Sequence, residues 1–310
     1  MALERKTINK HQREFAEKVQ ESKPLPGRRP EWLKVKLPTG KNYVDVKNLM
    51  RNNKLNTVCE EAKCPNLAEC WNHRTATFMI LGDTCTRSCG FCNIKVGMPN
   101  ELDLDEPRRV ADAVNNLQLR HVVITSVNRD ELYDGGAGIF AETIRMIRET
   151  TPDCTIEILI PDFKGFEPAF EIIMKNPPDI LNHNLETVPG LYHAVRPQAK
   201  YQRSLDLIKW FHDRGLKTKS GIMVGIGEKK EEVVELMRDL VAHKCDILTI
   251  GQYLQPTVNH LPVDRFVTPE EFDYYKEEGL AMGFKIVESA PLVRSSYHAD
   301  KQARMVTHLN

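Results

Sequence analysis

From residue 77 to residue 287 the sequence alternates short apolar runs with amphipathic stretches of helical period. The apolar runs predict strands at 77–81, 121–126, 154–160, 179–184, 217–224, 246–252 and 284–287. Helices are predicted at 107–117, 139–149, 167–175, 201–214 and 231–243, and a last helix begins after Thr268 as N-cap, with Pro269 at N1. This alternation predicts a parallel sheet with right-handed crossovers, either open or closed. In barrels of this kind, chemistry lies at the C-terminal ends of the strands.

Three cysteines follow the first predicted strand, in the spacing Cys85-x3-Cys89-x2-Cys92. Thiolates are soft ligands that suit iron–sulfur clusters and zinc. Structural zinc takes four ligands, and no fourth ligand lies within this loop. A four-iron cluster held by three thiolates leaves one iron open to a ligand that is not protein. We therefore interpret the loop as a cluster site; the alternatives are a zinc site or a group of reduced thiols.

A second cysteine set, Cys59-x4-Cys64-x5-Cys70, precedes the first predicted strand. Spacing alone leaves two interpretations open, a zinc site completed by His73 or an iron–sulfur cluster completed by a distant residue. The neighbouring loop favours the cluster, because iron–sulfur assembly is already needed there. The two remaining cysteines, at 154 and 245, stand alone and are expected to be buried small residues.

Lysine plus arginine equals aspartate plus glutamate, at 43 each, which argues against a nucleic-acid-binding protein. Residues 1–41 hold 11 basic against 5 acidic residues, with little periodicity, so residues 1–45 are expected to form a solvated, partly disordered arm. The alternative is a docking surface for an acidic partner. A short helix is expected near 45–56. No run has a signal-peptide core or transmembrane length, so we expect a cytoplasmic protein without membrane contact. Eight cysteines in such a protein favour metal binding or catalysis over disulfides.

The first cysteine loop, with the aromatic Phe91 before its last cysteine, resembles the signature of the radical S-adenosylmethionine (SAM) enzymes. The resemblance implies an α/β fold built as a partial (β/α)6 TIM-type barrel with N-terminal and C-terminal extensions. It also implies that Cys85, Cys89 and Cys92 hold a [4Fe–4S] cluster whose open iron is chelated by SAM. One electron from that cluster then splits SAM into methionine and a 5′-deoxyadenosyl radical.

Further stretches are candidates for SAM contacts. The sequence from Gly221 through Gly225 to Glu228 resembles the Gly-x-Ile-x-Gly-x-x-Glu stretch of radical enzymes, although such glycines are also common turn material. Gly135 and Gly136 resemble the pair that contacts the methionyl amino group, but Ala137 stands where an acid is usual, and an ordinary turn is the alternative. Glu186 is a candidate partner for the ribose hydroxyls or simply a solvated loop acid.

Five separated motifs resemble the lipoyl synthases, a family of radical SAM enzymes. They lie at 58–66, 70–71, 76–78, 105–111 and 291–297, and the resemblance spans roughly residues 31–300. It implies that Cys59, Cys64 and Cys70 bind an auxiliary [4Fe–4S] cluster, with Ser296 or alternatively Ser295 as the fourth ligand. That cluster is the expected sulfur source.

The resemblance also implies the reaction and its partners. Two sulfur atoms enter C6 and C8 of an octanoyl chain on a lysine of a lipoyl carrier domain, as in 2-oxo-acid dehydrogenase E2 subunits and the glycine cleavage H protein. A ferredoxin or flavodoxin would supply electrons. The expected division is an N-terminal arm (1–45), an auxiliary-cluster segment (46–75), a barrel (76–288) and a closing C-terminal segment (289–310). A tRNA methylthiotransferase and a metal-stabilised electron-transfer module are the alternatives.

Overall fold

Seven parallel strands lie side by side in chain order in the computed structural model, which describes residues 10–22, 29–35, 41–62, 64–72 and 77–307. They are β2 (Thr77–Ile80), β5 (His121–Ser126), β6 (Thr155–Leu159), β7 (Ile180–Asn182), β8 (Lys217–Val224), β9 (Ile247–Gln252) and β10 (Ile286–Ser289). A two-residue strand, β1 (Asn56–Thr57), pairs antiparallel with β2, so β1 and β10 are the edges of the sheet. All seven predicted strands are therefore confirmed.

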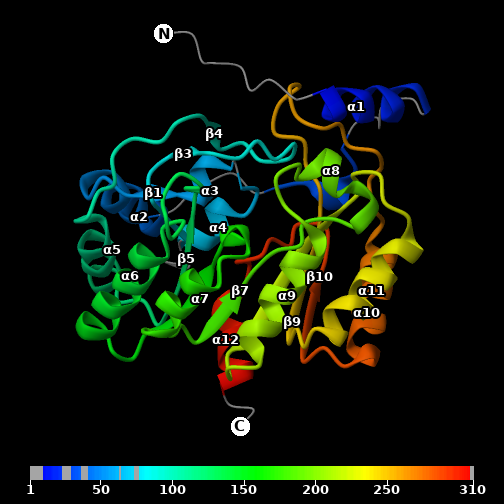
Figure 1. Cartoon of the computed structure of the whole chain (residues 1–310). Coiled ribbons are helices and arrows are strands. Elements are labelled where there is room, and N and C mark those ends of the chain that lie inside the picture. Colours follow the sequence, from blue (N-terminus) through cyan, green and yellow to red (C-terminus); the bar gives the residue numbers. More distant parts are fainter. Residues whose placement is uncertain (1–9, 23–28, 36–40, 63, 73–76, 308–310) are drawn as a thin grey trace.

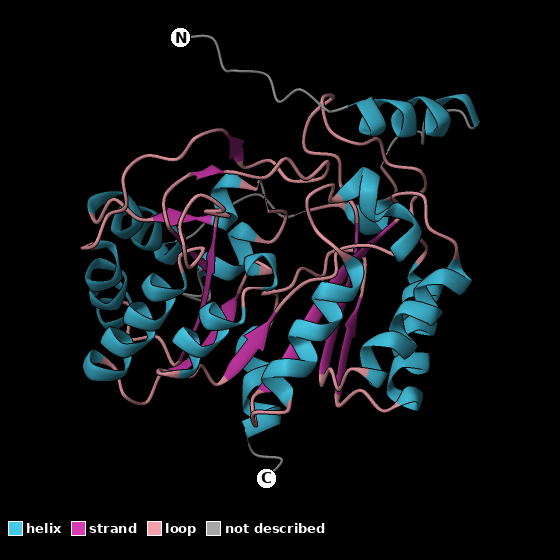
Figure 2. Ribbon diagram, in the orientation of Figure 1, coloured by secondary structure: helices cyan, strands magenta, loops and turns pink. Residues whose placement is uncertain are grey.

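Helices cover the outer face of this curved sheet (Figures 1 and 2). The crossover helices are α5 (Glu106–Asn116), α6 (Ala137–Thr150), α7 (Glu167–Met174), α9 (Tyr201–His212), α10 (Lys230–Ala242) and α11 (Pro269–Met282). The predicted start of α11 is confirmed, because the Thr268 side chain accepts from the N–H of Glu271 and Pro269 follows at N1. The fold is the expected partial TIM-type barrel with extensions.

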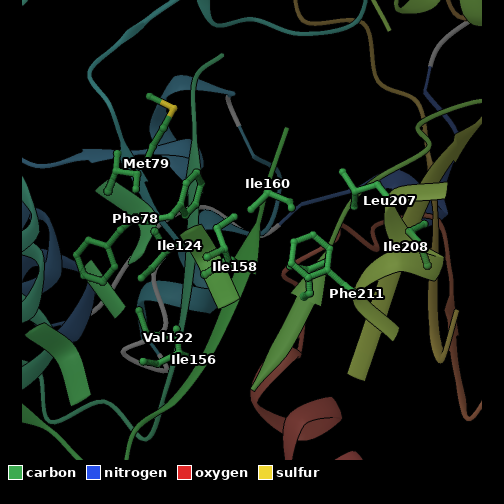
Figure 3. Packing of buried hydrophobic residues seen from close by; sticks show 14 of the residues in the cluster. Phe78, Met79, Val122, Ile124, Ile156, Ile158, Ile160, Leu207, Ile208 and Phe211 are labelled. Carbon is green, nitrogen blue, oxygen red and sulfur yellow. The ribbon is translucent and has the colours of Figure 1, made fainter. Parts of the chain in front are cut away.

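The main core lies between the sheet and these helices. Figure 3 shows Phe78, Ile124 and Ile158 of three adjacent strands on the same side as Ile208 and Phe211 of α9. Each of these side chains is fully buried. Burial of one such side chain contributes about 1.5–3 kcal/mol, so this layer holds the strands in register and fixes where their C-terminal ends lie.

The expected arm at residues 1–45 contains regular structure in its described parts. Helix α1 (Lys10–Ser22) and the start of α2 (Lys41–Asn52) fall there, together with the short 3-10 helix η1 (Glu31–Leu33). Helix α1 lies beside α8 (Tyr192–Val195), at one end of the barrel (Figure 1). Its Gln12 side chain is buried and donates to the Ser88 carbonyl at 3.0 Å. Contacts with the barrel, rather than the helix's own pattern, therefore stabilise α1.

Helix α12 (Ala299–Thr307), which was not predicted, packs against the opposite end of the barrel (Figure 1). Its Ala303 and Val306 form a small apolar cluster with Ile180, Ile247 and Ile286, which begin three of the strands. It therefore closes the N-terminal ends of the strands. Within the described ranges, no helix combines the length and apolarity needed to cross a membrane.

Candidate active site

A cavity of about 950 Å³ opens where the parallel strands end. Its walls include the strand residues Met79, Thr125, Leu159, Gly221 and Thr249, and the loops that follow them. Side chains of both cysteine sets line it: Cys59, Cys64, Cys85, Cys89 and Cys92. Cys70, the sixth cysteine of the two sets, is not among the described residues that line the cavity, but the charges of Cys59 and Cys64 act on it. The structure thus brings the two sets together at the edge of the sheet where chemistry is expected.

Hydrogen bonds from three other segments hold the first cysteine loop (residues 85–92). The Sγ of Cys85, which ends the short strand β3 (Thr84–Cys85), accepts from the N–H of Asn128 at 3.3 Å. The Gly90 N–H donates to the Val195 carbonyl at 2.8 Å, and the Gly90 carbonyl accepts from the N–H of Leu261 at 3.1 Å. The positions of the three thiols are therefore set by the barrel as well as by the loop.

Two buried polar side chains fasten this loop further. The Arg87 guanidinium makes a bidentate pair with Asp130 at 2.7 and 2.8 Å, and it contacts Asp162 at 2.7 Å. Burial alone would raise the pKa of Asp162, but the Arg87 charge outweighs it and holds that pKa well below its usual range. The His260 Nε2–H donates to the Cys92 carbonyl at 3.0 Å. The loop is therefore braced at its middle and at its last cysteine.

The second cysteine set lies on α3 (Val58–Glu61), α4 (Leu67–Asn72) and the turn between them. The N–H of Cys64 donates to the Cys59 carbonyl at 3.0 Å, and the N–H of Cys70 donates to the Asn66 carbonyl at 2.9 Å. Burial, followed by the charge of Cys59, raises the pKa of Cys64 to about 11, and burial also raises the pKa of Cys70. These thiols stay protonated at neutral pH until a metal displaces the proton.

The C-terminal segment (residues 290–298) crosses the cavity from β9 to β2. At β9, a Cβ on Gly251 would overlap the carbonyl oxygen of Val293, so only glycine fits there. At β2, the Thr77 hydroxyl donates to the Ser296 Oγ at 2.9 Å. Both serines of the segment line the cavity. This places the candidate oxygen ligands on the same cavity as the cysteines.

The same segment is fastened to the second cysteine set. The Asn66 side-chain amide donates to the Leu292 carbonyl at 2.7 Å, and the Tyr297 hydroxyl donates to the Glu69 carboxylate at 3.2 Å. Asn66 directly precedes α4, and Glu69 lies on it. The two parts of the proposed auxiliary site are thus held together by direct contacts.

Two of the residues predicted to contact SAM, Glu186 and Gly221, line the cavity. A Cβ on Gly221 would lie 2.6 Å from the Thr249 Oγ1 and 2.8 Å from the Asn184 Oδ1, so the backbone there must be bare. The Asn184 amide donates to the Glu186 carboxylate at 3.1 Å, while its Oδ1 is buried without a partner among the described residues. Burial raises the pKa of Glu186, whose backbone takes a left-handed φ of 68°. Strain of this kind and an unpaired acceptor are typical of a ligand site.

Gly225 and Glu228 are not among the described residues that line the cavity. The Glu228 carboxylate accepts from the N–H groups of Gly225 at 2.6 Å and of Ile226 at 3.0 Å. It therefore stabilises the turn after β8, and burial raises its pKa.

Gly135 and Gly136 also lie outside the described lining of this cavity. They form the turn before α6 with φ of 61° and 91°, and a Cβ on either would press on Phe163 or Leu81. Both positions require glycine for the backbone and the packing. The structure does not bring them together with Glu186 and Gly221.

Sequence reasoning missed two arginines that line the cavity, Arg196 and Arg294. Arg196 donates to the Asn184 carbonyl at 2.7 Å, and Arg294 donates to the Val293 carbonyl at 2.6 Å. The positive charges of both lower the pKa of Glu186 against the effect of burial. Arg294 lies inside the 291–297 motif, in which the resemblance points only to the serines as ligands. Arg196 follows a short helix and carries no local signal.

The donor set fits iron–sulfur clusters. Five of the six thiols in the two sets line one cavity, the charges of two of them act on Cys70, and thiolates are the ligands that such clusters take. In the part of the chain that the structure describes, no trio of His, Cys, Asp or Glu converges as ligands of a single metal ion would. His73, the candidate fourth zinc ligand, falls outside the described residues.

Known families match most of the chain. The model of the radical SAM superfamily matches residues 79–240, which is more than half of the 310 residues of this chain. The model of the N-terminal domain of lipoyl synthase of the radical SAM family matches residues 3–64. The lipoyl synthase of Rubrobacter xylanophilus is 62% identical over 276 residues, which cover 88% of this chain and 86% of that one. The lipoyl synthase of Oceanobacillus iheyensis is 57% identical over 278 residues, covering 89% and 88%.

Solved structures of similar fold are more distant in sequence. Streptococcus suis SuiB bound to SAM has a TM-score of 0.57 at 14% identity, and the match covers 80% of this chain and 61% of SuiB. Methylornithine synthase (PylB) has a TM-score of 0.53 at 14% identity, covering 92% and 88%. These likenesses concern the fold alone.

The parallel sheet, the first cysteine loop and the superfamily match define an enzyme of the radical SAM class. Within that class, the chain belongs to the lipoyl synthase family. SAM and two [4Fe–4S] clusters are accordingly its cofactors. The electron-transfer and tRNA methylthiotransferase alternatives are set aside.

Proposed function

We propose two ligand sets on one cavity: Cys85, Cys89 and Cys92 for the radical-generating [4Fe–4S] cluster, and Cys59, Cys64, Cys70 and Ser296 for the auxiliary [4Fe–4S] cluster. As a member of the lipoyl synthase family, the enzyme inserts two sulfur atoms into a protein-bound octanoyl chain. The observation that carries the ligand assignment is the meeting of both cysteine sets on one cavity. A reaction that joins a radical to a sulfur atom needs both sources within reach of one substrate chain.

The substrate explains the character of the cavity. Carbons 6 and 8 of an octanoyl chain carry no acidic proton for a general base to remove, so proton chemistry alone does not activate them. When bound, SAM and the two clusters would supply the deoxyadenosyl radical and the sulfur. The walls of this chain hold the alkyl tail by apolar contact, with Met79, Leu159 and Val293 among them. They also exclude water from the reacting carbons.

For SAM we propose direct contacts from the wall around Glu186 and Gly221. The unpaired Asn184 Oδ1 is placed to accept from a ligand hydroxyl or amine, and Arg196 supplies a nearby positive charge. Gly225 and Glu228 would act by shaping the turn after β8. The prediction that Gly135 and Gly136 contact the methionyl amino group has no comparable support from the cavity.

The carrier and electron partners are also part of the proposal. We infer that the octanoyl-lysine is presented by lipoyl carrier domains of the 2-oxo-acid dehydrogenase E2 and glycine cleavage H type, and that a ferredoxin or flavodoxin supplies electrons. A cytoplasmic location suits six thiols that must stay reduced to bind iron. We keep the division into arm (1–45), auxiliary segment (46–75), barrel (76–288) and closing segment (289–310), which the contacts of the closing segment with the auxiliary segment support.

Anaerobic iron and sulfide analysis of the reconstituted protein tests the ligand assignment. About eight irons per chain are expected, and Cys64→Ala should lower this to about four. The variant should still cleave SAM while losing sulfur insertion, because only the auxiliary site is removed. Eight irons and full sulfur insertion in Cys64→Ala would disprove the assignment.

A further inference from the structure

Thr77 connects two parts of the proposed auxiliary site. It begins β2, is 4% exposed, and donates from its hydroxyl to the Ser296 Oγ at 2.9 Å. Its carbonyl accepts from the Thr57 hydroxyl at 2.9 Å, and the Thr57 Oγ1 accepts from the N–H of Cys59 at 3.2 Å. One line of hydrogen bonds therefore runs from Cys59 to Ser296 through two buried threonines.

The contact between the Thr77 and Ser296 hydroxyls suits a serine that binds metal. The Thr77 Oγ1 lies 2.9 Å from the Ser296 Oγ, and a hydroxyl can donate or accept, so Thr77 can donate to the Ser296 Oγ once that oxygen has given up its own proton. A serine that had to donate to its neighbour would lose that hydrogen bond on binding iron. The arrangement therefore favours the deprotonated oxygen rather than opposing it.

We propose that Thr77 is a positioning residue that selects Ser296 over Ser295 as the oxygen ligand of the auxiliary cluster and fixes its orientation. This inference rests on the proposed function of the second cysteine set. Neighbouring residues of a segment point their side chains in different directions, and it is the Ser296 oxygen that lies within hydrogen-bond distance of Thr77.

The effect of such a residue is expected to be large. Serine oxygen is a harder and poorer match to cluster iron than thiolate, so its hold on iron depends on being well aimed. Outer partners of metal ligands typically change affinity or activity by 10–100-fold when removed. Thr77 would thus control how readily the auxiliary cluster releases the iron that serine holds.

Thr77→Val tests the proposal, because it deletes the hydroxyl and keeps the side-chain shape. The full chain carries Cys85→Ala, Cys89→Ala and Cys92→Ala in addition, so that all bound iron belongs to the auxiliary site. The readouts are the rate at which a chelator removes iron and the Mössbauer spectrum of the cluster. We expect about tenfold faster release or more, and a changed signal for one iron site. Thr77→Ser should restore both to the parent values.

Matched variants separate this role from a general packing effect. Thr143→Val deletes another buried hydroxyl, which donates to the Ile139 carbonyl within α6 at 2.7 Å, and it should leave iron release unchanged. Ser295→Ala should also leave it unchanged. In a Ser296→Cys background, Thr77→Val should have no effect, because the thiolate does not need the hydrogen bond. Thr77→Ala provides a second hydroxyl deletion, without added bulk, should the valine variant fail to fold.

The outcomes distinguish the ligand role of Ser296 from the positioning role of Thr77. If Ser296→Ala leaves iron release and spectrum unchanged, the ligand assignment itself fails. If Ser296→Ala accelerates release while Thr77→Val and Thr77→Ala do not, the role of Thr77 is overturned and the proposed function stands.

Discussion

Asn66 and Leu292 lie 226 positions apart in the sequence, and the Asn66 side-chain amide donates to the Leu292 carbonyl at 2.7 Å. Asn66 stands between two cysteines of the second set, and Leu292 belongs to the C-terminal segment. The proposed auxiliary site is therefore assembled from both ends of the chain. Its integrity depends on how closely the C-terminal segment approaches the barrel.

Gly251→Ala should displace the C-terminal segment, since the added methyl group would overlap the Val293 carbonyl oxygen. We expect iron content to fall from about eight towards about four per chain while SAM cleavage persists. Iron analysis and deoxyadenosine release after reduction measure the two effects. Gly190→Ala is the control, because its new Cβ would lie 3.7 Å from the Glu232 Oε1, an ordinary van der Waals contact. Unchanged iron content in Gly251→Ala would contradict this account.

Arg87→Met should destabilise the protein by about 3–5 kcal/mol, because it leaves the carboxylate of Asp162 buried without its main partner. Arg87→Lys should fall between Met and wild type, since lysine cannot make the bidentate pair with Asp130. Urea unfolding of the metal-free chain measures the loss. Arg108→Met removes an arginine whose pairs with Asp105 and Asp112 are exposed, and it should change little. Equal effects at the two arginines would refute the anchoring role.

His183 should make stability depend on pH below neutrality. Burial lowers its pKa to about 4 from an ordinary value near 6.5, while its ring bonds to the Ile160 carbonyl and the Ser204 hydroxyl. Because the unfolded chain binds the extra proton first, this stability is present above pH 6.5 and is lost as pH falls towards 4. The total is about 3 kcal/mol. Unfolding midpoints measured over this range should flatten in His183→Asn, whereas His243→Asn should keep the wild-type slope.

Removal of iron should loosen the proposed auxiliary site more than the barrel. Cluster binding contributes to folding free energy where its ligands come from short, separate segments, as α3, α4 and the C-terminal segment are here. Hydrogen exchange should therefore accelerate in peptides from these segments after chelation. Peptides from α9 and β8 should keep their protection, because the apolar core holds them. Uniform acceleration throughout the chain would argue against separate contributions.

Much of the barrel follows from local pattern. The strands at 121–126 and 217–224 begin and end where the apolar runs predict, and the crossover helices shift by only a residue or two. Helices α1 and α12 were not predicted from the sequence because contacts with distant parts of the chain stabilise them. Gln12 reaches the first cysteine loop, and Val306 packs on residues from three strands. Such long-range contacts produce no periodic pattern of apolar residues in the sequence.

Part of the site likewise follows from local sequence pattern, and part depends on contacts between residues that are distant in the sequence. The cysteines of each set lie close together in the sequence, so their spacing and the ligand chemistry of thiolates predict a metal centre at both sets. The contact of Thr77 with Ser296 spans 219 positions and could not be read from either motif. Arg196 and the unpaired Asn184 acceptor are recognisable only once the strand ends are brought together. Conversely, Glu228 lies in a motif, yet its carboxylate is occupied by backbone N–H groups.

Chain ends are usually where a protein tolerates trimming or a fused tag most easily. In this protein the stretch after β10 forms an inner wall of the reaction chamber before it reaches α12. A frameshift or premature stop codon after β10 would therefore remove part of the cavity wall together with Ser296, although every barrel strand would be present. We expect such a product to fold over most of its length and to lack the proposed auxiliary cluster.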